Sequence, residues 1–190
     1  MIKVGSRRVD DPVVITTLAG YDAMSEDDCR RHELVDGELV EIPPRTPGHQ
    51  RALMMLTNQL DEQLPAGLDV VHSFDVLLKD GSWPLMRKPD VVVASIRAFR
   101  DEVTRFDAAD VALVVEIMSE ESEDVDLRIK LREYAAAGIP NYWIVALDGP
   151  ATMAAYTLAN GRYELAEGGT GTLDVVSPSP MTLNLDELIR

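Results

Sequence analysis

The chain has 190 residues, a net charge of −15 from 33 acidic residues against 18 lysines and arginines, and one cysteine, Cys29. This length predicts one domain with room for a proper hydrophobic core. A lone cysteine excludes an intramolecular disulfide and a cysteine-rich zinc site, which fits a reducing compartment. The acidic excess opposes non-specific attraction to nucleic acid or an anionic membrane. No segment is apolar for the length of a membrane span, and the first ten residues lack the apolar core of a signal peptide, so we expect a cytoplasmic protein.

The first half of the chain predicts a hairpin and a helix ahead of a buried strand. The hairpin signal is Glu33–Ile42, ELVDGELVEI, because Asp36-Gly37 is a two-residue turn between apolar pairs. A helix follows at His49–Leu64, where leucines recur on one helical face. The other expected elements are a short helix within Leu18–Arg30, a loop at Pro43–Gly48, strands at Leu68–Leu78 and Lys88–Ser95 around a turn at Asp80–Pro84, and a polar connection at Ile96–Asp110.

The middle of the chain predicts a strand, a helix and a second strand. Val111–Met118 is an apolar run that is too short for a helix and suits a buried strand. Ser119–Asp124 supplies the hydroxyls and acids of a helix N-terminus, and Gly138 is the expected cap of a helix that runs to about Ala137. The second strand is Tyr142–Leu147, and the helical link between the strands favours a parallel crossover.

The C-terminal part predicts a second hairpin at Thr152–Ala166 that turns at Asn160-Gly161, then a short strand at Leu173–Val176 and a closing helical turn at Asp186–Arg190. The core order is helix, three strands, helix, strand. We therefore expect an α/β fold, a mixed central sheet flanked by helices with an N-terminal and a C-terminal hairpin, in a single domain over residues 1–190.

Two acidic residues stand within or beside the predicted buried strands. Asp90 opens the apolar run Val91–Val93, and Glu116 interrupts the run Val111–Met118. A carboxylate in a buried strand is costly unless a partner compensates it. If the two strands are neighbours, both carboxylates project from one end of the sheet, roughly 4–6 Å apart. Such a pair suits Mg²⁺, which takes few carboxylate ligands, keeps several waters and neutralises charge on a phosphoryl group.

Lys130, on the predicted helix, is the third candidate, because a lysine near developing negative charge stabilises it as a point charge. Each candidate also has a plain structural interpretation. Pro89-Asp90 fits a turn that starts a strand. Lys130 follows Asp126 by four positions and fits a solvated surface salt bridge of small value. Glu116 is the hardest to explain in this way, because apolar residues precede it.

Three segments resemble the Uma2 family of candidate bacterial endonucleases. They are Pro89-Asp90 with three valines, Val115–Ser119, and Asp126–Val145, DLRIKLREYAAAGIPNYWIV. The first hairpin and Pro47-Gly-His49 also match the family. The resemblance covers roughly residues 33–147. It implies a restriction-endonuclease-like core there, with the motif Pro-Asp, then Asp or Glu, any residue, Lys. It also implies that Asp90 and Glu116 hold Mg²⁺ or Mn²⁺.

The chain departs from this motif at one position. Met118 stands two residues after Glu116, where the motif has lysine. The resemblance implies that Lys130 replaces the missing lysine, and its long flexible stem makes this feasible from a helix.

Other polar residues are candidates for lesser roles. His49 is a candidate proton shuttle or an ordinary helix-terminal histidine, and Glu33 is an additional metal ligand or, by preference, a solvated strand-end carboxylate. Two basic clusters predict a local surface for phosphates, or else ordinary solvated faces. They are Arg97, Arg100 and Arg105, and Arg128, Lys130 and Arg132.

The sequence thus favours a Mg²⁺-dependent endonuclease that hydrolyses DNA, with Asp90, Glu116 and Lys130 as catalytic residues, and we expect a homodimer because such nucleases often pair to cut two strands. Two alternatives stay open. One is a non-catalytic interaction module on a nuclease-like fold, which the acidic balance and Met118 favour. The other is a hydrolase of a small phosphorylated substrate, for which the sequence offers no phosphate-binding loop.

Overall fold

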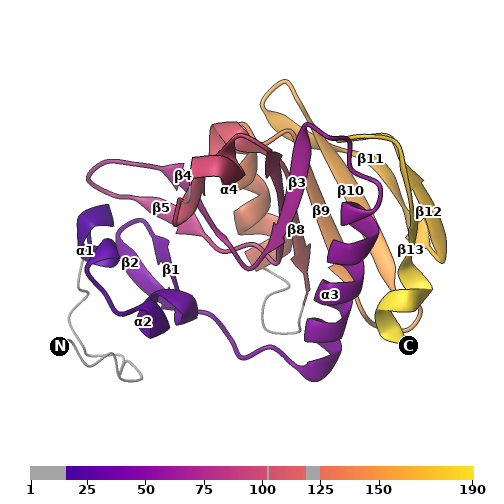
Figure 1. Cartoon of the computed structure of the whole chain (residues 1–190), viewed down its shortest axis with the longest axis horizontal. Coiled ribbons are helices and arrows are strands. Elements are labelled where there is room, and N and C mark those ends of the chain that lie inside the picture. The colour runs from indigo at the N-terminus through magenta and orange to yellow at the C-terminus, as the bar shows by residue number, and fades with distance from the viewer. Residues whose placement is uncertain (1–15, 102, 119–124) are drawn as a thin grey trace. The chain divides into compact units, whose positions relative to one another are not determined.

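The computed structural model describes residues 16–101, 103–118 and 125–190, and the chain divides into two compact units (Figure 1). The smaller unit comprises Met1–Pro44 and Leu77–Arg87, and the larger comprises Arg45–Val76 and Lys88–Arg190. The segment predicted as the core, residues 33–147, contributes to both units. The single domain over residues 1–190 therefore stays a prediction.

The smaller unit is built on the first predicted hairpin. Strands β1 (His32–Val35) and β2 (Glu38–Glu41) pair antiparallel around Asp36 and Gly37, whose φ angles of 47° and 80° are those of a tight two-residue turn. A third strand that the sequence did not predict, β5 (Leu85–Arg87), pairs with β1. Leu34 and Met86 are fully buried between these strands.

The short helix predicted within Leu18–Arg30 is confirmed, and the segment also holds most of a second helix. The two helices are α1 (Leu18–Asp22) and α2 (Glu26–Arg31). The Ser25 side chain accepts a hydrogen bond from the backbone N–H of Asp28, so it starts a new helix rather than continuing the first.

The larger unit contains a six-stranded mixed sheet in the order β11-β10-β9-β8-β6-β3, which confirms the α/β class. In the described part of the chain, only the β8–β9 pair of this sheet is parallel, and the other strand pairs are antiparallel. The strands are β3 (Leu68–His72), β6 (Val91–Ser95), β8 (Val111–Ile117), β9 (Asn141–Ala146), β10 (Thr152–Ala159) and β11 (Arg162–Thr170).

The strand predicted over Leu68–Leu78 is wrong as one element. Ser73 has a φ of 54°, in the left-handed region, and this bend separates β3 from β4 (Asp75–Lys79). The polar connection that follows β6 carries η1 (Ala98–Asp101), β7 (Arg105–Asp107) and η2 (Ala108–Asp110).

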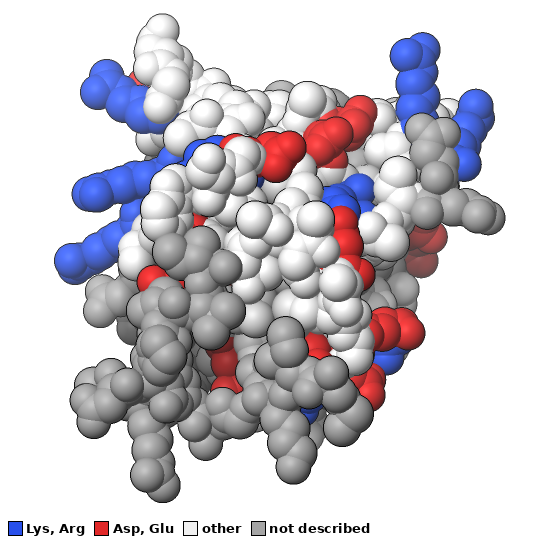
Figure 2. Space-filling model, turned by 90° about the vertical axis from the view of Figure 1, so that its left-hand side faces the viewer, with Lys and Arg blue, Asp and Glu red and all other residues white. Residues whose placement is uncertain are grey.

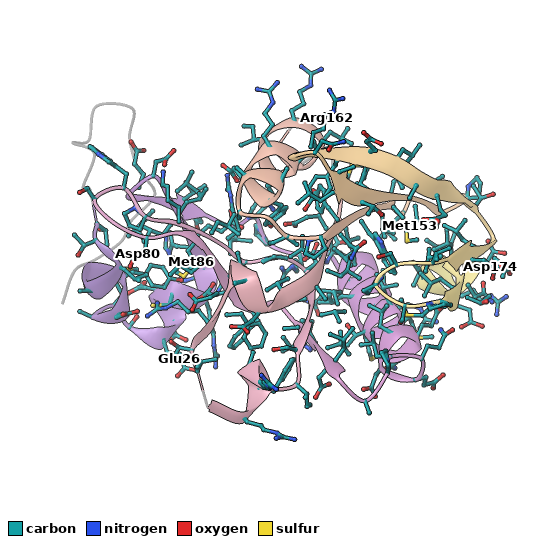
Figure 3. All side chains as sticks on the ribbon, turned by 90° about the horizontal axis from the view of Figure 1, so that it is seen from above. Glu26, Asp80, Met86, Met153, Arg162 and Asp174 are labelled. Carbon is teal, nitrogen blue, oxygen red and sulfur yellow. The ribbon has the colours of Figure 1, made fainter. Side chains whose placement is uncertain are left out.

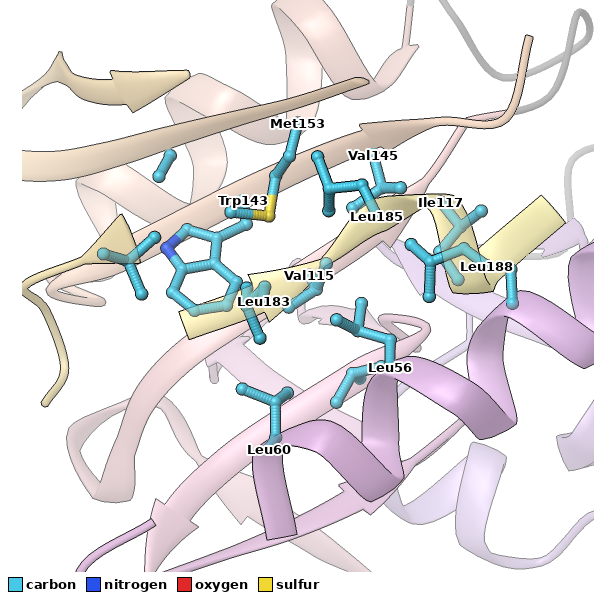
Figure 4. Close-up of a cluster of buried hydrophobic side chains, with 14 of the residues drawn as sticks. Leu56, Leu60, Val115, Ile117, Trp143, Val145, Met153, Leu183, Leu185 and Leu188 are labelled. Carbon is cyan, nitrogen blue, oxygen red and sulfur yellow. The ribbon is translucent and has the colours of Figure 1, made fainter. Parts of the chain in front are cut away.

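Helix α3 (Pro47–Asp61) packs its apolar face into the core of the larger unit. The Thr46 side chain caps its N-terminus by accepting from the His49 N–H. Leu56 and Leu60 are fully buried and lie in one cluster with Trp143 of the sheet and with C-terminal leucines (Figure 4). Those leucines come from β13 (Met181–Asn184), a strand the sequence missed, and from η4 (Leu185–Ile189).

The second predicted hairpin is confirmed and is longer than expected. Strands β10 and β11 turn at Asn160 and Gly161, with φ angles of 51° and 78°. Arg162 follows the turn and its side chain extends outward from the ribbon (Figure 3). After this hairpin, β12 (Thr172–Val175) pairs antiparallel with β13.

The predicted crossover between β8 and β9 is also confirmed. It consists of a π-helical segment, η3 (Val125–Lys130), and α4 (Leu131–Ala136), while the predicted helix start at Ser119–Asp124 lies outside the described residues. Gly138 has a φ of 80°, the Ile139 N–H bonds to the Tyr134 carbonyl, and the Gly138 N–H bonds to the Ala135 carbonyl. This pair of bonds is a Schellman cap, and it fixes the end of the helix that carries Tyr134.

Replacing Gly138 by alanine is expected to lower the free energy of unfolding by about 1–2 kcal/mol, because an L-residue is strained in the left-handed region. Urea denaturation measures the effect. Gly67→Ala is the matched control, because an added Cβ there meets nothing within 4 Å and its φ is not positive. Equal stability of the two variants would contradict this account of the cap.

Candidate active site

Asp90 and Glu116 lie on neighbouring antiparallel strands. Val91 of β6 pairs with Val115 of β8, so the register carries Asp90 to the position opposite Glu116. Both residues are only 4% exposed. The prediction that these strands are neighbours is confirmed, whereas the separation of the two carboxylates stays a prediction.

The Asp90 carboxylate receives three donors or cations from the larger unit. Its Oδ1 lies 2.7 Å from Nη2 of Arg45. Its Oδ2 accepts a 2.8 Å hydrogen bond from the backbone N–H of Ile117 and lies 3.2 Å from Nε2 of His49. Asp90 is therefore more than the start of a strand, because its side chain ties together β8, the start of α3 and the segment before it.

These contacts set the protonation of Asp90. Burial raises the pKa of the carboxyl, but the hydrogen bond and charge of His49, the Arg45 guanidinium and the Ile117 N–H outweigh it, so the pKa lies below its usual value. Asp90 is consequently a carboxylate near neutral pH, the form that a hard cation binds.

Glu116 points to the other face of the sheet from its neighbours Val115 and Ile117, which belong to the apolar core. On that face its Oε1 lies 2.9 Å from Nζ of Lys130 and accepts a 2.6 Å hydrogen bond from the Tyr134 hydroxyl. The η3–α4 crossover thus supplies both a cation and a hydroxyl to the carboxylate that interrupts β8.

The alternative interpretation, in which Lys130 is solvated, is wrong. Its side chain is 10% exposed and that of Glu116 is 5% exposed, so the pair is a buried one. Breaking a buried ion pair by removing one partner costs about 3–5 kcal/mol, far more than a surface pair. The alternative pairing with Asp126 involves a side chain outside the described residues.

The donor set fits a Mg²⁺ or Mn²⁺ ion. Asp90 and Glu116 lie opposite each other in the register of β6 and β8, and Mg²⁺ binds through one or two carboxylates while it keeps its waters. Both acids are charge-balanced by Arg45 and Lys130, so a cation would have to compete with these side chains. Within the described ranges no group of three or more His, Cys, Asp or Glu side chains is placed to hold a metal ion.

A family model described as "Uma2: Putative restriction endonuclease" matches residues 18–186. The chain belongs to the Uma2 family. This confirms the resemblance inferred from the sequence, and the match extends well beyond the residues 33–147 on which that inference relied. No curated protein matches the chain.

The Uma2 chain is also similar to a solved structure, described as a "putative nuclease belonging to DUF820 from Anabaena variabilis ATCC 29413". The TM-score is 0.65 at 14% sequence identity, and the match covers 91% of this chain and 97% of that chain. At this identity the likeness concerns the fold, and it agrees with the nuclease-like fold that the sequence predicted.

Two candidates of lesser rank, His49 and Glu33, are both buried in this Uma2 chain. His49 is buried and contacts Asp90, and its Nδ1 has no hydrogen-bond partner among the residues that the structure describes. Its role as a proton shuttle stays a prediction. The preference for a solvated Glu33 is wrong, because Glu33 is 7% exposed and its Oε2 accepts a 2.7 Å bond from Arg87 within the smaller unit.

Two residues that contact the candidate acids of this Uma2 chain were not predicted from the sequence. Arg45 stands in a predicted loop with no periodic pattern around it. Tyr134 follows Lys130 by four positions, so on a continuous helix the two share a face, and this spacing was an available signal. The hydroxyl of a buried tyrosine usually needs a hydrogen-bond partner, and the Tyr134 hydroxyl donates its hydrogen bond to Glu116.

The residues of the two predicted basic clusters differ in exposure. Lys130 is buried against Glu116, whereas Arg97, Arg100, Arg128 and Arg132 are exposed and Arg105 is half-buried. On the face drawn in Figure 2, Lys and Arg side chains lie mainly towards the edges, with others near the centre, and Asp and Glu side chains lie between them. In the described ranges no helix is both long and apolar enough to cross a membrane.

Proposed function

We propose that the chain is a Mg²⁺- or Mn²⁺-dependent endonuclease, a hydrolase of DNA phosphodiester bonds. The observation that carries the proposal is the position of Lys130, whose ammonium lies 2.9 Å from Glu116 although Met118 replaces the motif lysine. An acid, a second acid and a lysine are thus supplied by neighbouring elements of the larger unit, and membership of the Uma2 family supports nuclease chemistry for them.

Asp90 and Glu116 would hold the metal ion, which supplies Lewis-acid stabilisation of charge on a phosphoryl oxygen. Lys130 places a positive charge beside Glu116, where it stabilises negative charge that develops on the phosphate. Tyr134 holds the Glu116 carboxylate by its hydroxyl, and the Ile117 N–H holds that of Asp90. Both carboxylates are therefore held in place before the substrate binds, so the reaction does not lose the conformational entropy of ordering them.

A non-catalytic interaction module is the second candidate function. One observation favours it: both oxygens of Asp90 are engaged by partners from this chain. If these polar side chains bind only one another, their contacts stabilise the larger unit and no metal ion or phosphate is bound.

Binding of DNA separates the two candidates, since the net charge of −15 opposes it at long range. We expect weak binding of a labelled duplex in EDTA and at least tenfold tighter binding in Ca²⁺, because the ion offsets the carboxylates that face the phosphate. Fluorescence anisotropy at low salt measures it, with duplex and single strand compared, and added salt should weaken it with a shallow slope. Failure of both DNAs to bind in Ca²⁺ would favour the non-catalytic module.

The homodimer and the cytoplasmic location belong to the same proposal. Cutting both strands of a duplex requires two active sites or two successive events, and a pair of identical chains supplies two sites. Light scattering coupled to size-exclusion chromatography, with and without DNA, measures the assembly.

A further inference from the structure

Arg45 closes a ring of contacts around the Asp90 carboxylate. Its Nη2 lies 2.7 Å from Asp90 Oδ1, and its Nη1 donates a 2.7 Å hydrogen bond to the Ser73 hydroxyl. The Ser73 N–H in turn donates to the Asp90 carbonyl oxygen at 2.9 Å. Ser73 has a left-handed φ of 54°, and this bend between β3 and β4 directs the Ser73 hydroxyl to Arg45 and the Ser73 N–H to Asp90.

The oxygens of Asp90 are divided between two kinds of partner. His49 and the Ile117 N–H both use Oδ2, which orients the carboxylate from the protein side. Arg45 uses Oδ1, and its side chain is 22% exposed whereas that of Asp90 is 6% exposed. The guanidinium therefore lies on the more accessible side of the carboxylate, where an incoming cation would approach.

We propose that Arg45 is the counter-ion of the metal-free site and competes with the divalent cation for Asp90 Oδ1. A guanidinium and a metal ion both need the lone pairs of this oxygen, and their like charges repel, so the two do not share it favourably. Binding of the cation releases Arg45 from Asp90, while Ser73 offers the guanidinium an acceptor that it already uses. This inference rests on the proposed function, because it takes Asp90 and Glu116 as the metal ligands.

The competition has a thermodynamic consequence that does not depend on catalysis. Two groups that exclude each other at one oxygen weaken each other's binding by the same factor. Loss of Arg45 must therefore raise the affinity of the site for the metal ion. We expect Arg45→Ala to tighten the binding of Mn²⁺ about tenfold, equal to about 1.4 kcal/mol. Arg45→Lys keeps the charge, but lysine cannot bridge both partners in the arginine geometry, so it should tighten Mn²⁺ by less than Arg45→Ala.

Isothermal titration calorimetry with MnCl₂ on the purified full chain measures these affinities, and circular dichroism of the same samples verifies the fold. Arg162→Ala is the charge-matched control. It also removes one positive charge, its side chain is 78% exposed at the β10–β11 turn, and its affinity for Mn²⁺ should equal that of the wild type.

Two outcomes overturn the inference, and they differ in what else they remove. If the wild type binds Mn²⁺ and Glu116→Gln does not, but Arg45→Ala binds no more tightly than wild type, the competition is refuted and the proposed function stands. If neither the wild type nor Arg45→Ala binds Mn²⁺, the metal site and the inference fail together. Should Arg45→Ala not fold, the Arg45→Lys variant decides: affinity at or below that of the wild type refutes the competition.

Discussion

Glu116→Gln is expected to abolish detectable cleavage of plasmid DNA, with a loss of about 10²–10³-fold or more, and to weaken Mn²⁺ binding at least tenfold. Glutamine has nearly the same shape as glutamate and keeps an oxygen for the Tyr134 hydroxyl, so the change removes mainly the charge. In the proposed metal site, the substitution would leave Asp90 as the sole anionic ligand. Supercoiled plasmid in Mg²⁺ reports cleavage, and calorimetry with MnCl₂ reports the ion.

This variant requires a stability control, because it leaves Lys130 buried opposite a neutral group. Removal of one partner of such a pair costs about 3–5 kcal/mol, while removal of both partners is often close to neutral. The double variant Glu116→Gln/Lys130→Met should therefore be more stable than Glu116→Gln alone and equally inactive. Full cleavage by either variant would exclude Glu116 from the chemistry and leave it as a structural ion-pair partner.

The sequence predicted those features that are encoded locally. Asp36-Gly37 and Asn160-Gly161 both adopt the positive φ angles that two-residue hairpin turns need, and the sequence shows this directly because few residues tolerate them. Glu116 was found for a related reason. A carboxylate inside an apolar run violates the pattern of a buried strand, and the structure shows the compensation in Lys130 and Tyr134.

The sequence did not predict the partners of Asp90, because those are set by the path of the chain. Arg45 precedes Asp90 by 45 positions, and only the placement of α3 against the sheet brings its guanidinium to the carboxylate. The break at Ser73 was missed because a left-handed residue that is not glycine leaves no compositional mark. Short strands such as β5 and β13 carry too few residues to show a period of two.

The sequence left two interpretations of Lys130 open, a group at the site and a solvated surface residue. A lysine spaced at i+4 from an acid on a predicted helix fits a surface pair, which is the commoner arrangement. Glu116 favours the other interpretation. A buried carboxylate needs a compensating partner, and the helix that follows its strand is the nearest segment that can supply a cation. The two observations were available together in the sequence, and the structure shows that the second outweighs the first.

Lys130→Met is expected to separate the role of the lysine from that of the metal ligands. Methionine keeps the length and apolar stem of lysine and removes the charge, so contacts within the crossover are retained. We expect cleavage to fall by about 10²–10³-fold, the scale for loss of one group that stabilises charge in a transition state. Mn²⁺ affinity should be unchanged or higher, because the ammonium that competes for Glu116 Oε1 is gone.

Two comparisons make this result specific. Arg132→Met removes a positive charge from an exposed position of α4 and should leave both cleavage and Mn²⁺ affinity at wild-type values. Lys130→Arg keeps the charge and should recover part of the activity, less than fully because the planar guanidinium differs from a compact ammonium. Cleavage by Lys130→Met at the wild-type rate, with metal still bound, would show that Lys130 serves only to balance Glu116. The chain would then cleave DNA with no lysine acting at position 118 or 130, and another group would have to stabilise the charge that develops on the phosphate.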